Sequence, residues 1–133
     1  MRTTLPVEQE IVDLETTALR RWAEGDPDGF LHICAHDIVY FDPFHEHRVD
    51  GLPALTELYE SLRGQVRIDR FEIIDPRVTV QGDFALLTFN FRSFGELENR
   101  WNATEVYRRE GGFWKLIHSH WSITRPQLLE PGV

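Results

Sequence analysis

The sequence predicts an α+β fold in which three helices come first and pack on one face of a mostly antiparallel sheet. Two observations carry this prediction. Apolar residues recur at helical spacing up to residue 64, and they form strand-like segments from residue 66 onward. The chain has 133 residues and contains no internal repeat, low-complexity segment or linker, so we expect one domain over residues 1–133.

The first helix is indicated by apolar residues that share one helical face: Val7, Ile11, Leu14, Ala18 and Trp22. Gly25 follows where a helix commonly stops. A short second helix is then predicted, with Asp26 as its cap and Pro27 in its first position, ending near His36. These two helices should supply the N-terminal part of the core.

Residues 38–41 have the composition of a short strand, and a third helix is predicted between Gly51 and Gly64. The rest of the chain predicts strand segments at residues 66–74, 77–81, 84–94, 100–109 and 113–124. Asp75 and Pro76 interrupt the first two segments, and a tight turn at 110–112 joins the last two. We expect residues 126–133 to be a loose tail.

Composition and charge exclude several classes of function. The net charge is −8, and Lys115 is the only lysine, so the chain lacks the basic face that nucleic acids require. No apolar run approaches the ~20 residues that span a bilayer. The first ten residues lack the pattern of a signal peptide, so we expect a soluble cytoplasmic protein. Cys34 is the only cysteine and permits no intramolecular disulfide.

Asp42 is the first candidate for chemistry, because it directly follows an apolar and aromatic strand. Burial favours the neutral form of a carboxyl group, and such a group can accept a proton near neutral pH. The alternative is that Asp42 and Pro43 end the strand, with the carboxylate binding the backbone of the turn. The dipeptide alone leaves both interpretations open.

The order of these elements resembles a known superfamily. The segment Asp37-Ile38-Val39-Tyr40-Phe41-Asp42-Pro43-Phe44, followed by Val49-Asp50-Gly51, is similar to the ketosteroid isomerase-like superfamily. This superfamily is also called nuclear transport factor 2-like and includes the SnoaL-like polyketide cyclases. The closing strand, residues 113–122, is similar to that of the calcium/calmodulin-dependent protein kinase II association domain. The resemblance implies a curved sheet that forms a cone-shaped pocket, and leaves the function open.

The resemblance also implies roles for individual residues. Asp42 matches the aspartate that moves the substrate proton in ketosteroid isomerases, Tyr59 matches a supporting tyrosine, and Trp121 matches a tryptophan of the pocket wall. Ala18 stands where the isomerases have their oxyanion tyrosine, and Thr104 stands where they have a protonated aspartic acid. Each lost donor costs on the order of 10²–10³ in rate, so we do not expect steroid isomerisation.

Strand alternation extends the predicted pocket. If Trp121 points inward, Ser119 and Ile117 should lie beside it, and on the neighbouring strand Thr104 should bring Asn102 and Val106 inward. Tyr40 should share the face of Asp42. The predicted binding residues are therefore Tyr40, Tyr59, Asn102, Thr104, Ser119 and Trp121, around a small hydrophobic molecule. The alternative is a filled core in which the aromatic residues only pack together.

The histidines do not predict a metal site, because the pairs at 32/36, 45/47 and 118/120 lie on separate elements. We therefore expect neither a metal nor another cofactor. His45 and His47 follow Asp42 closely, and either could be its acid partner, although both also fit an exposed loop.

The outer face of the sheet is predicted to carry Trp101, Ala103 and Tyr107 together with His118 and His120. An aromatic patch of this kind usually marks an association surface. Proteins of the resembled superfamily commonly dimerise through this face, so we expect a homodimer.

Two functions remain in competition at this stage. The first is an enzyme of isomerase, cyclase or hydrolase type that transfers a proton on a small apolar substrate, with Asp42 as base and Tyr40, Asn102 and Thr104 orienting the substrate's oxygen. The second is a non-catalytic module that binds a metabolite or assembles. The acidity of Asp42 would distinguish them.

Overall fold

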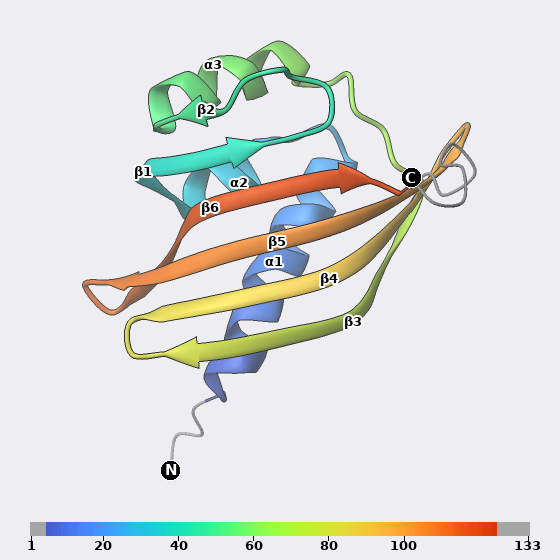
Figure 1. The fold of residues 1–133 in the computed structure, drawn as a ribbon. Helices are drawn as coiled ribbons and strands as arrows, with labels where there is room; N and C mark the ends of the chain where they lie inside the picture. Colours follow the sequence, from blue (N-terminus) through green and yellow to red (C-terminus); the bar gives the residue numbers. More distant parts are fainter. Residues whose placement is uncertain (1–4, 125–133) are drawn as a thin grey trace, which may run out of the picture.

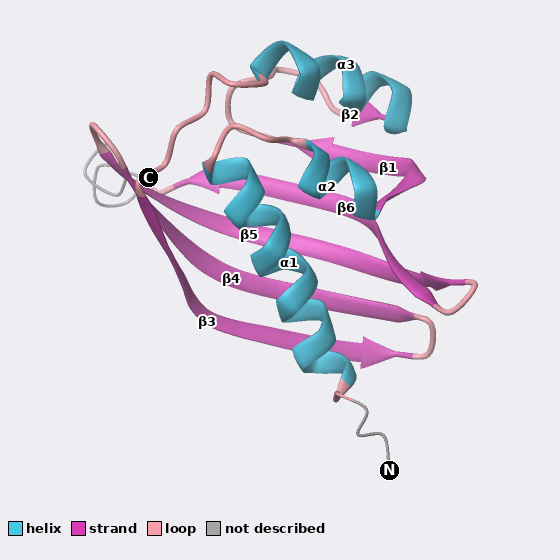
Figure 2. Cartoon of the chain, turned by 180° about the vertical axis from the view of Figure 1, so that it is seen from behind, coloured by secondary structure: helices cyan, strands magenta, loops and turns pink. Residues whose placement is uncertain are grey.

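A computed structural model of the chain describes residues 5–124, and the predicted tail at 126–133 lies outside them. Six strands form one sheet in the order β2-β1-β6-β5-β4-β3. All three helices lie on one side of this sheet, and the sheet curves around them (Figures 1 and 2). The α+β prediction is confirmed, and the curved sheet gives the fold its cone shape.

Helix α1 (Val7–Ala23) crosses the inner face of the sheet, as Figure 2 shows. It buries Ile11, Ala18 and Leu19, as apolar residues at helical spacing should. Glu15 is also buried on this face, although a glutamate is usually exposed. The chain turns after the helix at Gly25, whose φ of +86° suits glycine.

Helix α2 (Asp28–Ile33) begins one residue later than predicted, with Pro27 in the capping position, and the Asp26 carboxylate accepts the Asp28 N–H at 3.0 Å in the turn before it. It ends earlier than predicted, because strand β1 (Cys34–Phe41) already begins at Cys34. Cys34 pairs with Leu116 of the last strand, and this long-range partner overrides the local helical preference.

The short strand β2 (Val49–Asp50) pairs with β1 and leads into helix α3 (Leu52–Leu62). The end of α3 is tied back to the turn between α1 and α2. Arg63 donates to Asp28 at 2.6 Å, and the Gly64 N–H donates to the Gly25 carbonyl at 2.9 Å. A Cβ on Gly25 would lie 3.1 Å from the Gly64 Cα, so this close approach requires glycine.

Four long strands complete the sheet: β3 (Arg70–Gln81), β4 (Phe84–Phe94), β5 (Glu98–Glu110) and β6 (Phe113–Ile123). The two predicted segments before residue 82 are one strand, and its register shifts at Asp75-Pro76. Asp75 has a φ of +49° there. An irregularity of this kind bends a strand without ending it.

The sheet is antiparallel except between β1 and β6, which run parallel. A second irregularity lies in β6, where Ile117 is an extra residue between Leu116, which pairs with Tyr107, and His118, which pairs with Val106. No helix within residues 5–124 is long and apolar enough to cross a membrane.

Candidate functional site

A cavity of about 370 Å³ opens between the helices and the inner face of the sheet. Eight aromatic side chains line it: Trp22, Phe30, Tyr40, Phe44, Tyr59, Phe91, Trp101 and Trp121. Its polar lining comes from Asp42, His45, Ser93 and Asn99. The volume and the apolar walls with a few polar groups are those of a small-molecule site.

Asp42 lies directly after β1 and shapes the turn that follows. Its Oδ1 accepts the backbone N–H of Phe44 at 2.8 Å and that of His45 at 2.9 Å. This is the local bonding by which aspartate forms turns. Asp42 therefore has the contacts of a turn-forming aspartate, and it also belongs to the cavity lining.

The same carboxylate also holds two side chains at the cavity wall. The Tyr40 hydroxyl donates to Oδ2 at 2.9 Å, and the His45 Nδ1 lies 2.9 Å from both carboxylate oxygens. The side chain of Asp42 is 6% exposed, whereas that of His45 is 41% exposed. Because a carboxylate can only accept, Nδ1 carries a proton, and Nε2 is the ring nitrogen that can accept one.

Tyr59 extends this arrangement into the core. Its hydroxyl donates to the Tyr40 hydroxyl, and the two rings meet edge to face with their centroids 5.5 Å apart. Burial, and secondarily the Asp42 charge, raises the pKa of Tyr40, and burial raises the pKa of Tyr59 well above its ordinary value. Both phenols therefore remain hydrogen-bond donors at neutral pH.

Of the residues that the sequence predicted for the site, the structure places Tyr40, Asp42, Tyr59 and Trp121 in the cavity wall. Ser119 is buried directly beneath the wall, where its hydroxyl accepts the Trp121 Nε1–H at 3.1 Å.

The predicted facing of Asn102 and Thr104 is wrong. Asn102 lies on the outer face, where its amide oxygen accepts from Asn90 at 2.7 Å, and Thr104 pairs with the exposed His120. The reason is the register between β5 and β6. Trp121 pairs with Ala103, so the odd-numbered residues of β5 face inward. A shift of one residue in the pairing register moves every side chain of a strand to the opposite face of the sheet.

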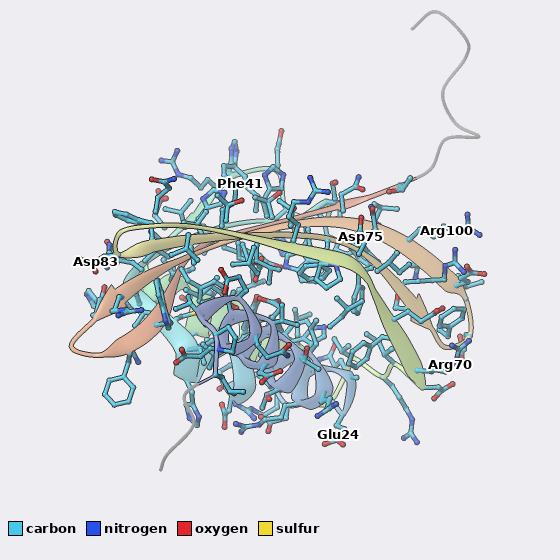
Figure 3. All side chains as sticks on the ribbon, turned by 90° about the horizontal axis from the view of Figure 1, so that it is seen from below. Glu24, Phe41, Arg70, Asp75, Asp83 and Arg100 are labelled. Carbon is cyan, nitrogen blue, oxygen red and sulfur yellow. The ribbon has the colours of Figure 1, made fainter. Side chains whose placement is uncertain are left out.

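The same register also shows that part of the predicted outer patch is wrong. Ala103 and Tyr107 are buried on the inner face, and Trp101 lines the cavity. His118 and His120 do lie on the outer face, where both rings pack near Phe41. Figure 3 shows Phe41 on the side of the sheet away from the helices.

Sequence reasoning missed three kinds of residue at the site. It did not decide between an acid partner of Asp42 and an exposed loop for His45, it placed Trp101 on the wrong face, and it did not consider the buried acids Glu15 and Glu105. The available signal for Glu15 was its position on the apolar face of α1, four residues from both Ile11 and Leu19. Among residues 5–124 no group of three or more His, Cys, Asp or Glu side chains could hold a metal ion.

The cavity enclosed by a cone of three helices and a curled sheet defines a nuclear transport factor 2-like α+β domain. The model of the SnoaL-like domain family matches residues 11–126, so the chain belongs to this family. No curated protein matches the chain.

Solved structures agree with this assignment. A proposed ketosteroid isomerase from Parabacteroides distasonis is 37% identical over 92% of this chain and 91% of that one, with a TM-score of 0.84. A protein of unknown function from Pseudomonas putida, described as nuclear transport factor 2-like, is 31% identical over 87% and 85%, with a TM-score of 0.78. The calcium/calmodulin-dependent protein kinase II hub of S. rosetta shares the fold, at 19% identity over 92% and 100%, with a TM-score of 0.74.

Proposed function

We propose that this domain binds a small, mostly apolar organic molecule in its cavity and transfers a proton on it, with His45 as the proton acceptor and Asp42 as the group that holds it. The observation that carries the proposal is the contact of the His45 Nδ1 with both Asp42 oxygens at 2.9 Å. This arrangement fixes the imidazole and directs its other nitrogen away from the carboxylate.

The contacts of Asp42 give it the orienting role in place of the role of base. Its two oxygens accept from the Tyr40 hydroxyl, two backbone N–H groups and the His45 ring. A carboxylate with this many donors has little capacity left for a substrate proton. His45 lines the cavity and is more exposed, so it is the better group to meet a substrate.

The proposed step is enolisation of a carbonyl compound. A C–H bond next to the carbonyl breaks, its proton moves to the His45 Nε2, and the electron pair moves to the carbonyl oxygen. The proton then returns to carbon. Ala18 lies outside the cavity lining and Thr104 faces outward, so neither serves the developing oxyanion. The amide of Asn99, in the cavity wall, is the donor that we assign to it.

The remaining lining selects the ligand. Tyr59 and Trp121 give the cavity aromatic walls, which favour a ring system over a flexible or charged chain. Ser119 contributes indirectly by holding the Trp121 indole. Asn102, on the outer face, has no part in this proposal.

The test is hydrogen–deuterium exchange at the α-carbon of 2-tetralone, a small bicyclic ketone, followed by NMR in deuterated buffer. The parent protein should accelerate exchange, and His45→Gln should lower the protein-dependent rate by on the order of 10²-fold. His47→Gln is the matched control, because His47 is 89% exposed and outside the cavity lining. An unchanged rate in His45→Gln would refute the role of His45.

We also propose that the domain forms a homodimer through the outer face of the sheet. One row across this face consists of Thr79, Leu86, Val106, His118 and Val39, paired strand to strand. The row is largely apolar, and the helices lie on the opposite side of the sheet (Figure 3). A second copy would remove this face from water.

A further inference from the structure

Two acidic side chains are buried together beneath the cavity. Glu15, on α1, is 1% exposed, and Glu105, on β5, is 0% exposed. The Tyr107 hydroxyl donates to Oε1 of Glu15 at 2.6 Å, and the Ser119 hydroxyl donates to Oε1 of Glu105 at 2.6 Å. Each carboxyl group therefore accepts one hydrogen bond from a hydroxyl group, through its Oε1.

The two carboxyl groups also interact with each other. The two side chains hydrogen-bond to each other, and neither Oε2 receives a conventional donor from residues 5–124. Two carboxylates have no proton to share, so at least one of the two acids is protonated. Burial raises the pKa of Glu15 to about 7, and burial with the Glu15 charge raises the pKa of Glu105 well above its ordinary value.

A short hydrogen-bonded chain links this pair to the cavity. The Ser119 hydroxyl has one proton, which it gives to Glu105, and its oxygen accepts the Trp121 Nε1–H at 3.1 Å. The Trp121 ring lines the cavity and packs edge to face against Phe91 and Trp101, with centroids 5.4 and 6.3 Å away. The acid pair is thus linked to a wall of the cavity through the Ser119 hydroxyl, and the Trp121 side chain also hydrogen-bonds to Glu105 directly.

We propose that Glu15 and Glu105 act through Ser119 as positioning residues for the Trp121 indole, so that the proton shared by the two acids controls the shape of the cavity. While the proton is present, one acid donates to the other and the Ser119 hydroxyl has a fixed direction. When the proton is lost, two negative charges face each other in the core, and the repulsion is relieved by movement of a carboxylate and its partners. The movement reaches Trp121 through Ser119.

Other titratable groups face the pair, and they stay neutral over the relevant pH range. Tyr107 lies on the same strand as Glu105, and burial raises its pKa well above its ordinary value. Burial and the two acids raise the pKa of Cys34, on β1, to about 12, and Lys115 acts on that thiol in the opposite direction. The Glu105 charge also acts on the buried phenols of Tyr40 and Tyr59. The acid pair is therefore the group whose charge changes near neutral pH.

The test follows the Trp121 indole directly and needs no ligand. The protein is labelled with 5-fluorotryptophan, the Trp121 resonance is assigned with Trp121→Phe, and ¹⁹F spectra are recorded from pH 5 to 9. The Trp121 resonance should shift with a midpoint near 7, in keeping with the raised pKa of Glu15. The shift should vanish in Glu15→Gln, which retains all histidines, including His45 and His118.

Ser119→Ala gives a second, independent test, because it removes the hydroxyl between Glu105 and Trp121 and leaves both acids in place. Its Trp121 resonance should shift less with pH than the parent resonance, because only the direct hydrogen bond between Trp121 and Glu105 remains. The inference would be overturned if the Trp121 resonance of the parent did not titrate. It would also be overturned if both variants, Glu15→Gln and Ser119→Ala, titrated as the parent does.

The consequence for binding rests on the proposed function of the cavity. The Kd of 2-tetralone should rise several-fold between pH 6 and pH 8 in the parent and stay level in Glu15→Gln. Absence of tetralone binding at any pH would contradict the proposed ligand class, whereas the fluorine titration decides the role of the acid pair separately.

Discussion

The Tyr107 hydroxyl on β5 lies 2.6 Å from Oε1 of Glu15 on α1, and this hydrogen bond joins residues that are 92 positions apart in the chain. Both side chains are fully buried. A helix that carries a glutamate into the core normally loses stability by doing so, because the charge must leave water. Here the phenol and the second acid, Glu105, provide the partners that make the burial tolerable.

We predict that this burial makes stability depend on pH. The pKa of Glu15 is about 7 in the folded protein, against an ordinary value of 4.5. Between these values the folded state keeps a proton that the unfolded chain has lost. The free energy of unfolding should therefore fall as pH rises through this window, by up to about 1.4 kcal/mol per pH unit for one proton, and level off above it.

Urea unfolding at pH 5, 6, 7 and 8 measures this dependence. Glu15→Gln lacks the proton, so its free energy of unfolding should change less between pH 5 and 7 than that of the parent. Glu8→Gln, at an exposed position of the same helix, is the control and should follow the parent. Identical pH dependence in the parent and in Glu15→Gln would show that Glu15 does not keep its proton.

Asp42→Asn should destabilise the protein by about 1–3 kcal/mol at pH 7. An asparagine can still accept the turn N–H groups through its oxygen, but its amide nitrogen then faces the Tyr40 hydroxyl and the His45 ring, which are both donors. Urea unfolding checks this, with Asp83→Asn at an exposed turn as the control, expected within about 0.5 kcal/mol of the parent. Equal or higher stability of Asp42→Asn would mean that the carboxylate is strained in the folded state.

Phe44→Ala should weaken ligand binding with little effect on stability. Phe44 is 70% exposed, yet it lines the cavity and packs edge to face with Trp101 at 6.0 Å between centroids. Its ring would therefore cover a bound ligand more than it covers the core. The Kd of 2-tetralone, measured by NMR titration, should rise several-fold. Phe113→Ala, 71% exposed at the start of β6 and outside the cavity lining, should leave the Kd unchanged.

Val106→Asp should weaken the proposed homodimer. Val106 pairs with Leu86 and His118 in the middle of the outer face, where dimerisation would bury the new charge without a partner. Sedimentation at micromolar concentration should give twice the 15.6 kDa chain mass for the parent and a lower average mass for Val106→Asp. Leu97→Asp, 75% exposed between β4 and β5, is the control and should not change the mass. A monomeric parent would contradict the dimer.

Local sequence patterns were sufficient for most of the fold. Strand β4 has the predicted bounds, because its alternation of buried and exposed side chains is unbroken over residues 84–94. Residues 34–36 were misassigned to a helix, since their partner β6 lies some eighty residues away and no local pattern reveals it. Strand β2 was missed for a similar reason, because it has only two residues and depends on β1.

The site was predictable where one strand sufficed. Tyr40, on β1, and Asp42, directly after it, are two residues apart in extended chain and share a face, and both line the cavity. Asn102 was misplaced because its facing depends on the register of β5 against β6, and the extra residue Ile117 complicates that register. Glu15 and Glu105 were missed because a lone glutamate is expected at the surface, and only the fold brings two of them together.

The place of β6 in the sheet has a consequence for synthesis on the ribosome. The strands that precede it fall into two groups, β2-β1 and β5-β4-β3, and β6 alone lies between them. Asp42 follows one group and Trp101 belongs to the other, so the two sides of the cavity come together only after residue 123 has left the exit tunnel. Until then the nascent chain exposes two open strand edges to any chaperone or neighbouring chain that can pair with them.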